Sequence, residues 1–126
     1  MNENMQKEQA KAVAEFAFAT LDNKKAMDVT LLEVSDQTIL ADYFLLATGT
    51  SNTHVRALAD EVEFKLREEF SIEPNHIEGT SGNAWTLMDY GSVIIHIFTP
   101  QAREFYKLER LWNGNEIKLK AGEDEE

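Results

Sequence analysis

The sequence predicts an α/β domain with a mixed sheet of about five strands flanked by helices. Three observations indicate this class: apolar residues at helical spacing in three segments, short runs rich in Val, Ile and aromatic residues between them, and turn residues at the junctions. The 126 residues suffice for one domain with its own core. We assign residues 1–115 to a single domain and residues 116–126 to an acidic C-terminal tail, which we expect to be flexible.

The first half of the chain predicts one helix followed by two strands. Apolar residues recur at helical spacing over residues 10–21, which is typical of an amphipathic helix. Residues 27–34 are rich in Val, Leu and Thr and predict a strand. The continuous apolar run over residues 43–47 predicts a central strand that is buried on both faces.

The second half predicts a helix, three strands and a final helix. Thr50 or Ser51 is placed to cap a helix whose apolar stripe runs from Val55 to Phe70 and which cannot continue past Pro74. Residues 76–78 predict a short strand. Residues 84–89 and 92–99 predict a hairpin joined at Tyr90 and Gly91. Thr99 and Pro100 have the residue types that begin a helix. We expect four residues to form the apolar stripe of this last helix: Phe105, Leu108, Leu111 and Trp112.

The charge of the chain restricts its partners. Lys and Arg number 12 against 23 Asp and Glu, which gives a net charge of -11. A field of this sign repels nucleic-acid backbones and anionic lipid, so we expect little direct nucleic-acid contact, no membrane association and a basic protein partner. The chain has no cysteine and a polar N-terminus without an apolar signal segment, which favours a cytoplasmic location.

Catalytic and metal-binding patterns are weak in this sequence. The three histidines, His54, His76 and His96, do not have ligand spacing, and we predict no metal, no cofactor and no catalytic residues. The turn over residues 48–51 resembles the Gly-Ser/Thr segment at which nucleotidyltransferases begin their active site. The Asp-x-Asp pair that would gather two metal ions in such enzymes does not follow it. Helix capping accounts for the same residues.

The predicted hairpin has two unlike faces, because side chains alternate along a strand. One face is aliphatic and suits a core: Met88, Val93, Ile95 and Ile97. The other face mixes rings, aliphatic groups, an acid and an imidazole: Trp85, Leu87, Asp89, Ile94, His96 and Phe98. This mixture is typical of a protein interface, which Tyr106 and Glu109 of the last helix would extend. A helix that covers this face, with Trp85 in the core, is the alternative that periodicity leaves open.

Several segments carry a family resemblance together. They are Asp42-Tyr43-Phe44, the run from Ala47 through Ser51 with His54 to Asp60, Glu78-Gly79, Trp85-Thr86-Leu87-Met88-Asp89-Tyr90-Gly91, His96-Ile97-Phe98, and residues 103–112. In combination they resemble the ribosomal silencing factor family, also called RsfS or Iojap, over about residues 5–113. The resemblance implies a non-enzymatic domain related in shape to nucleotidyltransferases, without their catalytic carboxylates.

The resemblance also implies a function. It implies binding to the large ribosomal subunit through the universal large-subunit protein number fourteen, a steric block of subunit joining, and repression of translation as a stress response to nutrient limitation. Carried over residue by residue, it implies contacts from Trp85, Asp89, Tyr90 and Tyr106; the face argument adds Leu87, His96 and Phe98. A minimal nucleotidyltransferase and an acidic adaptor for another basic protein remain alternatives, and a homodimer is left open.

Overall fold

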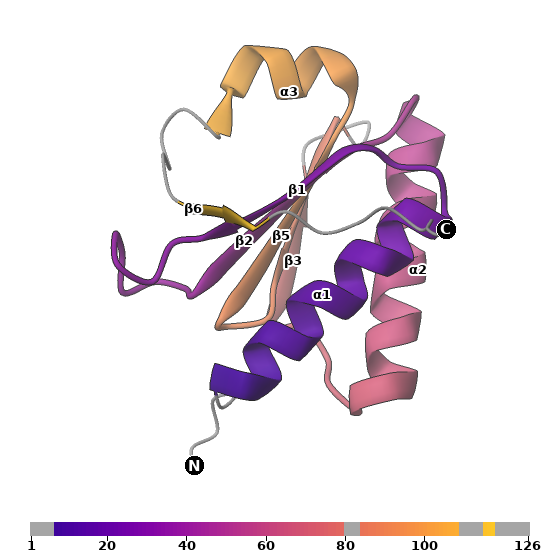
Figure 1. Ribbon diagram of the computed structural model, residues 1–126. Coiled ribbons are helices and arrows are strands. Elements are labelled where there is room, and N and C mark those ends of the chain that lie inside the picture. Colours follow the sequence, from indigo (N-terminus) through magenta and orange to yellow (C-terminus); the bar gives the residue numbers. More distant parts are fainter. Residues whose placement is uncertain (1–6, 80–83, 109–114, 118–126) are drawn as a thin grey trace, which may run out of the picture.

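A six-stranded mixed sheet organises the computed structural model, which describes residues 7–79, 84–108 and 115–117 (Figure 1). The elements in chain order are α1 (Lys7–Asn23), β1 (Met27–Glu33), β2 (Tyr43–Thr48), α2 (Asn52–Phe70), β3 (His76–Gly79), β4 (Trp85–Asp89), β5 (Val93–Phe98), α3 (Pro100–Tyr106) and β6 (Asn115–Ile117). The mixed α/β class predicted from the sequence is confirmed.

The strands lie in the order β3-β4-β5-β2-β1-β6. β2 and β5 run parallel, whereas the other neighbouring pairs are antiparallel. Every residue of β2 is buried, as the apolar run predicts for a central strand. α2 connects β2 to β3, which lies at the sheet edge. The two strands of the hairpin, β4 and β5, follow later in the chain and occupy the positions between β3 and β2.

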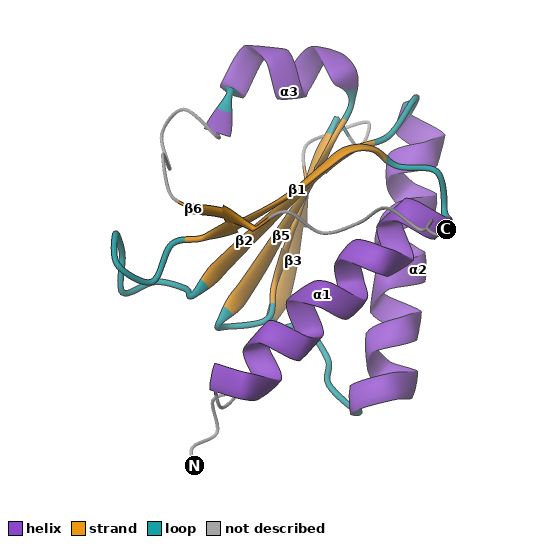
Figure 2. Ribbon diagram, viewed as in Figure 1, coloured by secondary structure: helices purple, strands orange, loops and turns teal. Residues whose placement is uncertain are grey.

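The two faces of the sheet are covered by different helices. α1 and α2 lie side by side on one face, and α3 lies on the other (Figures 1 and 2). Met88, Val93, Ile95 and Ile97 are fully buried in the core cluster beneath α1 and α2, which confirms the aliphatic face of the hairpin. A smaller apolar cluster, which includes Phe44, Leu46 and Phe98, lies on the α3 side.

The start of α2 is fixed by local hydrogen bonds. Ser51 is the N-cap, and its hydroxyl accepts the backbone N–H of His54 at 3.1 Å. The His54 ring joins two segments: Nδ1 accepts the Thr50 N–H at 2.9 Å, and Nε2 lies 2.9 Å from the Lys24 carbonyl oxygen. A Cβ on Gly49 would lie 2.9 Å from the backbone nitrogen of Val55, so this turn requires glycine. The turn therefore acts as a helix cap, as the sequence predicts.

The structure corrects the number of strands. A sixth strand, β6, pairs with β1 through Glu116 opposite Leu32 and Ile117 opposite Leu31. This strand has only three residues, too few for a periodicity to be recognised. It extends the sheet two residues into the segment assigned to the tail. Residues 118–126 lie outside the described part of the chain.

The hairpin turn also differs from the expectation. The Tyr90 N–H donates to the Val93 carbonyl at 2.9 Å, which leaves Gly91 and Ser92, rather than Tyr90 and Gly91, as the two loop residues. Gly91 has a φ of 86°. A positive φ at the first loop position favours glycine in a two-residue hairpin, so the shift by one residue removes the unfavourable tyrosine from that position.

The last helix is shorter than its apolar pattern suggests. α3 ends at Tyr106 because Lys107 adopts a left-handed conformation with a φ of 49° and its N–H caps the Arg103 carbonyl. Phe105 is 79% exposed, so its place in the expected apolar stripe is wrong. Leu108 packs against the smaller cluster, while Leu111 and Trp112 lie outside the described residues.

Leu45 and Leu40 allow a matched test of the core. Leu45 is fully buried in β2, whereas Leu40 is 70% exposed between β1 and β2. Leu45→Ala removes buried apolar volume and leaves a cavity, so we expect it to lower the free energy of unfolding by about 2–5 kcal/mol. Leu40→Ala should change it by less than about 0.5 kcal/mol. Urea denaturation followed by circular dichroism measures both, and equal losses would contradict the assignment of β2 to the core.

Candidate functional site

The hairpin brings six predicted side chains to the sheet face that α3 covers. The β4–β5 register pairs Trp85 with Phe98, Leu87 with His96, and Asp89 with Ile94. Because directly paired residues project to the same face, all six share one surface, as strand alternation predicts. β2 continues this surface, since Phe44 pairs with Ile94 and Leu46 pairs with His96.

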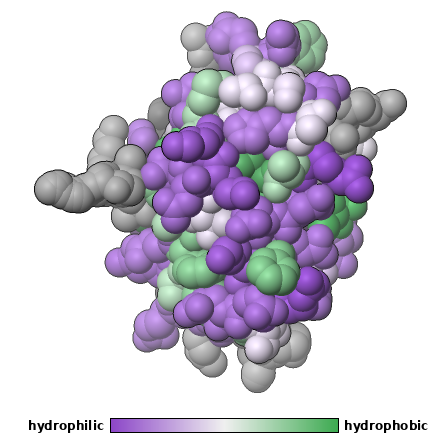
Figure 3. Space-filling model, turned by 90° about the vertical axis from the view of Figure 1, so that its right-hand side faces the viewer, coloured by the Kyte–Doolittle hydropathy of each residue, from purple (hydrophilic) through white to green (hydrophobic). Residues whose placement is uncertain are grey.

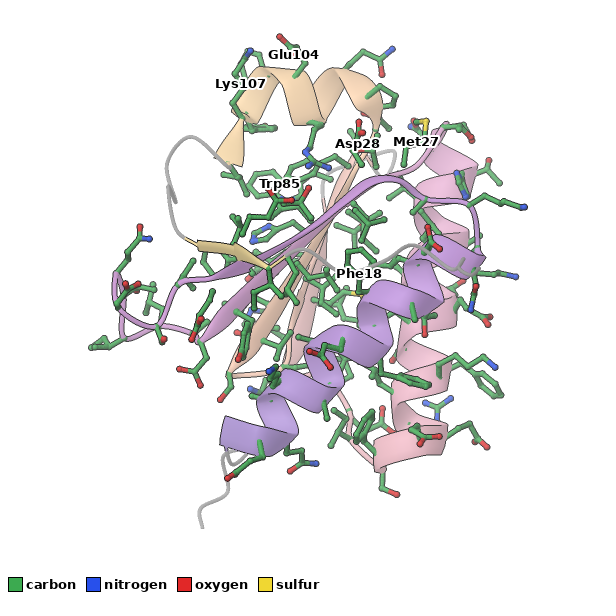
Figure 4. The ribbon with its side chains drawn as sticks, in the orientation of Figure 1. Phe18, Met27, Asp28, Trp85, Glu104 and Lys107 are labelled. Atoms are coloured by element: carbon green, nitrogen blue, oxygen red, sulfur yellow. The ribbon has the colours of Figure 1, made fainter. Side chains whose placement is uncertain are left out.

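Aromatic rings from β4, β5 and α3 pack together on this face. We call Trp85, His96, Phe98, Phe105 and Tyr106 the aromatic cluster. The Trp85 ring is stacked on Phe98 with centroids 5.5 Å apart, and it lies 4.6 Å from the Tyr106 ring. Figure 4 shows Trp85 between α3 and the sheet. Aromatic pairs at these distances add to the stability that area burial supplies, so the rings hold one another in place.

Exposure increases in steps across the aromatic cluster. Phe98 is fully buried and His96 is 5% exposed, whereas Trp85 is partly buried. Tyr106 is 40% exposed and Phe105 is 79% exposed. Phe105 packs edge-on against Tyr106 at 5.0 Å. The cluster therefore joins the core to the surface, so Trp85 is neither sealed beneath a helix nor free in solvent.

His96 supports Trp85 from beneath. The indole Nε1–H of Trp85 donates to His96 Nδ1 at 3.2 Å, which requires that Nδ1 carry no proton. Burial disfavours the charged ring and lowers the His96 pKa from 6.5 to about 4. The ring is therefore neutral at pH 7 with its proton on Nε2, and that atom is buried with no hydrogen-bond partner among the described residues.

Arg103 fixes α3 over the sheet. Its Nη1 donates to the Asp28 carbonyl at 3.0 Å and to the Thr48 hydroxyl at 2.9 Å, and its Nη2 donates to the Thr30 hydroxyl at 3.2 Å. Tyr106 lies three residues further along the same helix, so this anchor determines where its ring meets Trp85. Arg103 belongs to the family motif over residues 103–112, but nothing in its local spacing predicts this role.

Several of the expected contact residues have structural roles instead: Phe98 and His96 are buried beneath Trp85, and Tyr90 and Asp89 also serve the fold. Tyr90 is 5% exposed and belongs to the core cluster on the α1 and α2 side, so the structure does not bring it to the aromatic face. Burial and the nearby Glu63 raise its pKa. Asp89 does lie on the aromatic face, but its Oδ1 accepts the Gly91 N–H at 2.8 Å and so stabilises the turn. Glu109 lies outside the described residues.

A shallow hollow adjoins Trp85 on the β3 side. Glu78, Gly79, Trp85 and Leu87 line it, with a volume of about 180 Å³. Leu87 thus belongs to the border of the aromatic face rather than to its centre. The hollow provides a recess beside a large ring, which is the arrangement that an inserted side chain of a protein partner uses.

The described residues contain neither a metal-binding cluster nor a helix that could span a membrane. Residues 7–79, 84–108 and 115–117 contain no group of three His, Asp or Glu side chains arranged to hold a metal ion. Within the same ranges, no helix combines the length and the apolar character that a membrane span needs. The likeness to nucleotidyltransferases suggested by residues 48–51 stays a prediction.

The burial of His96 predicts how stability depends on pH. The unfolded ring takes up a proton near pH 6.5 and the folded ring near pH 4, so the unfolded state binds more protons between these values. Stability should therefore fall as the pH drops from 6.5 to 4, by roughly 3 kcal/mol in total from this residue. We expect His96→Gln to remove this slope in urea titrations at several pH values. His76→Gln, at an exposed ring, should leave the slope in place, and a slope that persists in His96→Gln would contradict the assignment.

Comparison with known proteins places the chain in a family. The model of a family described as "Ribosomal silencing factor during starvation" matches residues 7–126. The Bacillus subtilis ribosomal silencing factor RsfS is 35% identical over 102 residues, which cover 81% of this chain and 86% of that protein. The mouse mitochondrial assembly of ribosomal large subunit protein 1 is 31% identical over 108 residues, which cover 82% of this chain and 46% of that protein.

Comparison with solved structures supports the same family relationship. A crystal structure of a Chromobacterium violaceum protein matches with a TM-score of 0.75 and 32% identity, covering 94% of this chain and 97% of that one. The resemblance found in the sequence is thereby confirmed over nearly the whole chain. The chain belongs to the RsfS family of ribosomal silencing factors.

Proposed function

We propose that this chain is a non-enzymatic repressor of translation that binds the large ribosomal subunit. It docks through the aromatic face on a basic ribosomal protein, the universal large-subunit protein number fourteen, and prevents subunit joining when nutrients are short. The family name connects its members with starvation, and the mouse relative is named for assembly of the large ribosomal subunit. These names support the proposal at the level of the ribosome.

The aromatic cluster is the observation that carries the proposal. Its rings pass from the core at Phe98 through the partly buried Trp85 to the exposed Phe105 and Tyr106. Binding energy in protein interfaces concentrates in a few such aromatic residues, surrounded by contacts that exclude water. The cluster is held by Arg103 and by the Trp85–His96 hydrogen bond, so little conformational freedom is lost when a partner docks.

The charge supports a protein partner over ribosomal RNA. A chain with a net charge of -11 is repelled by the phosphate backbone and attracted by a basic protein surface. Electrostatic attraction mainly raises the rate of encounter, while the rings determine how long the complex lasts. The negative charge and the aromatic rings together favour docking on exposed protein surface of the large subunit.

Inhibition by this route requires occupancy of a surface and no chemical step. A domain of 14.3 kDa on the joining face of the large subunit leaves no room for the small subunit. The strength of repression then depends on affinity and on the concentration of the protein relative to small subunits. The role places the protein in the compartment where ribosomes assemble, which is the cytoplasm in a bacterial cell.

Trp85 and Phe64 give a matched test of the proposed face. Both are partly accessible rings, but Phe64 lies on α2, on the opposite side of the sheet, and is 48% exposed. Trp85→Ala should weaken co-sedimentation with isolated large subunits by about tenfold or more, because a central interface ring contributes more than 1 kcal/mol. Phe64→Ala should leave it unchanged. Binding is measured in sucrose gradients over a range of protein concentrations.

The same preparations test the inhibitory step. The unmodified protein should keep isolated subunits apart when they are mixed at a magnesium concentration that normally joins them, and Trp85→Ala should require about tenfold more protein for this effect. Equal co-sedimentation of Trp85→Ala and the unmodified protein would remove the aromatic face from the binding surface. Recovery of a non-ribosomal basic protein, without large subunits, would favour an adaptor.

A further inference from the structure

β3 forms one edge of the sheet and offers its outer side to solvent. It pairs with β4, and among residues 7–79, 84–108 and 115–117 no second strand lies beside it. All four of its residues, His76, Ile77, Glu78 and Gly79, are exposed. In an edge strand alternate backbone N–H and C=O groups point away from the sheet, where a further extended segment can pair with them.

Two hollows adjoin β3, one on each face of the sheet. The first is the hollow beside Trp85 and Leu87, with a volume of about 180 Å³. The second lies between β3 and α2, with a volume of about 320 Å³. Residues lining the second are Arg56, Ala59, Asp60, Glu63, Ile77 and Thr86, and Glu78 and Gly79 line both. An added strand would therefore have a recess on either side of its backbone.

The two hollows differ in chemistry. Two large apolar side chains, Trp85 and Leu87, line the first, beside the carboxylate of Glu78, which pairs with Leu87 and so lies on the same face. The second carries the carboxylates of Asp60 and Glu63 above the exposed Ile77. Arg56 lies 3.6 Å from Asp60 in an exposed ion pair, which water screens, so Glu63 keeps the local charge negative. Figure 3 views the α1 and α2 side and shows a largely hydrophilic surface with separate apolar patches.

We propose that β3 accepts an added strand from a basic protein, an extended segment in which Lys or Arg alternates with aliphatic residues. Side chains of a strand alternate between its faces. The basic residues would therefore enter the acidic hollow beside α2, and the aliphatic residues would enter the hollow beside Trp85. The added strand would continue the aromatic face by one strand, but its recognition does not depend on the partner being ribosomal.

Charge argues against a second copy of this chain as the occupant. Two copies paired through β3 would bring Glu78 and the α2 carboxylates of one molecule close to those of the other. Like charges in direct cross-strand positions are destabilising. The net charge of -11 adds long-range repulsion. The short, acidic edge thus disfavours self-pairing and favours a cationic strand.

A short synthetic peptide in which Lys and Val alternate, with blocked ends, tests the proposal on the full chain without ribosomes. We expect saturable binding in isothermal titration calorimetry and slower amide hydrogen exchange in β3 on binding. The double variant Asp60→Lys/Glu63→Lys should lose at least about tenfold in affinity. The control Glu68→Lys/Glu69→Lys changes two exposed α2 acids by the same charge and should lose less than about twofold.

Four results would overturn the inference. They are equal losses in the two double variants, unchanged exchange in β3, equal binding of a peptide in which Glu alternates with Val, and a dimer in which the β3 amides are already protected without the peptide. Because the peptide replaces the ribosome, failure here leaves the co-sedimentation test of Trp85→Ala unaffected. A failure of that ribosomal test likewise leaves the peptide result unaffected.

Discussion

Unequal coverage of the two sheet faces determines most of what this molecule presents to a partner. α1 and α2, of 17 and 19 residues, bury one face completely enough to form the main core. On the other face α3 has seven residues and covers part of the hairpin. The side chains there must bury one another, and stacked rings do this more effectively than separate aliphatic groups. Within the described residues, a face that a single short helix covers only in part is thus left with a surface suited to association.

Local patterns in the sequence account for the parts of the fold that were predicted. The apolar run of β2 and the stripe of α2 follow from periodicities that are confined to one element. Alternation along the hairpin also separated the aliphatic face from the mixed face. By the same alternation Tyr90 belongs with Met88 in the core, and it was the family resemblance, not the strand pattern, that placed it among the contact residues.

The missed features depend on distant or very small signals. Arg103 bonds to Asp28, which lies 75 residues earlier in the chain, so no spacing near α3 could reveal the contact. The end of α3 depends on a left-handed Lys107, a residue that seldom marks a helix end. Helical periodicity shows which residues lie on the same side of a helix, but not which side of the helix faces the sheet. It therefore placed Phe105 wrongly in the buried stripe of α3. Tertiary contacts, here the anchor at Arg103, make that choice.

The orientation of the Trp85 indole has a consequence for recognition. Its one polar atom points inward to His96, so the outward part of the ring is hydrocarbon. A partner gains no directional bond by placing an acceptor opposite it, and selectivity must come from the contour of the complementary surface and the charges around it. Substitutions of polar groups on the partner would therefore affect its affinity less than changes in the shape of its surface. Related partners with similar surface shapes would bind with similar affinity.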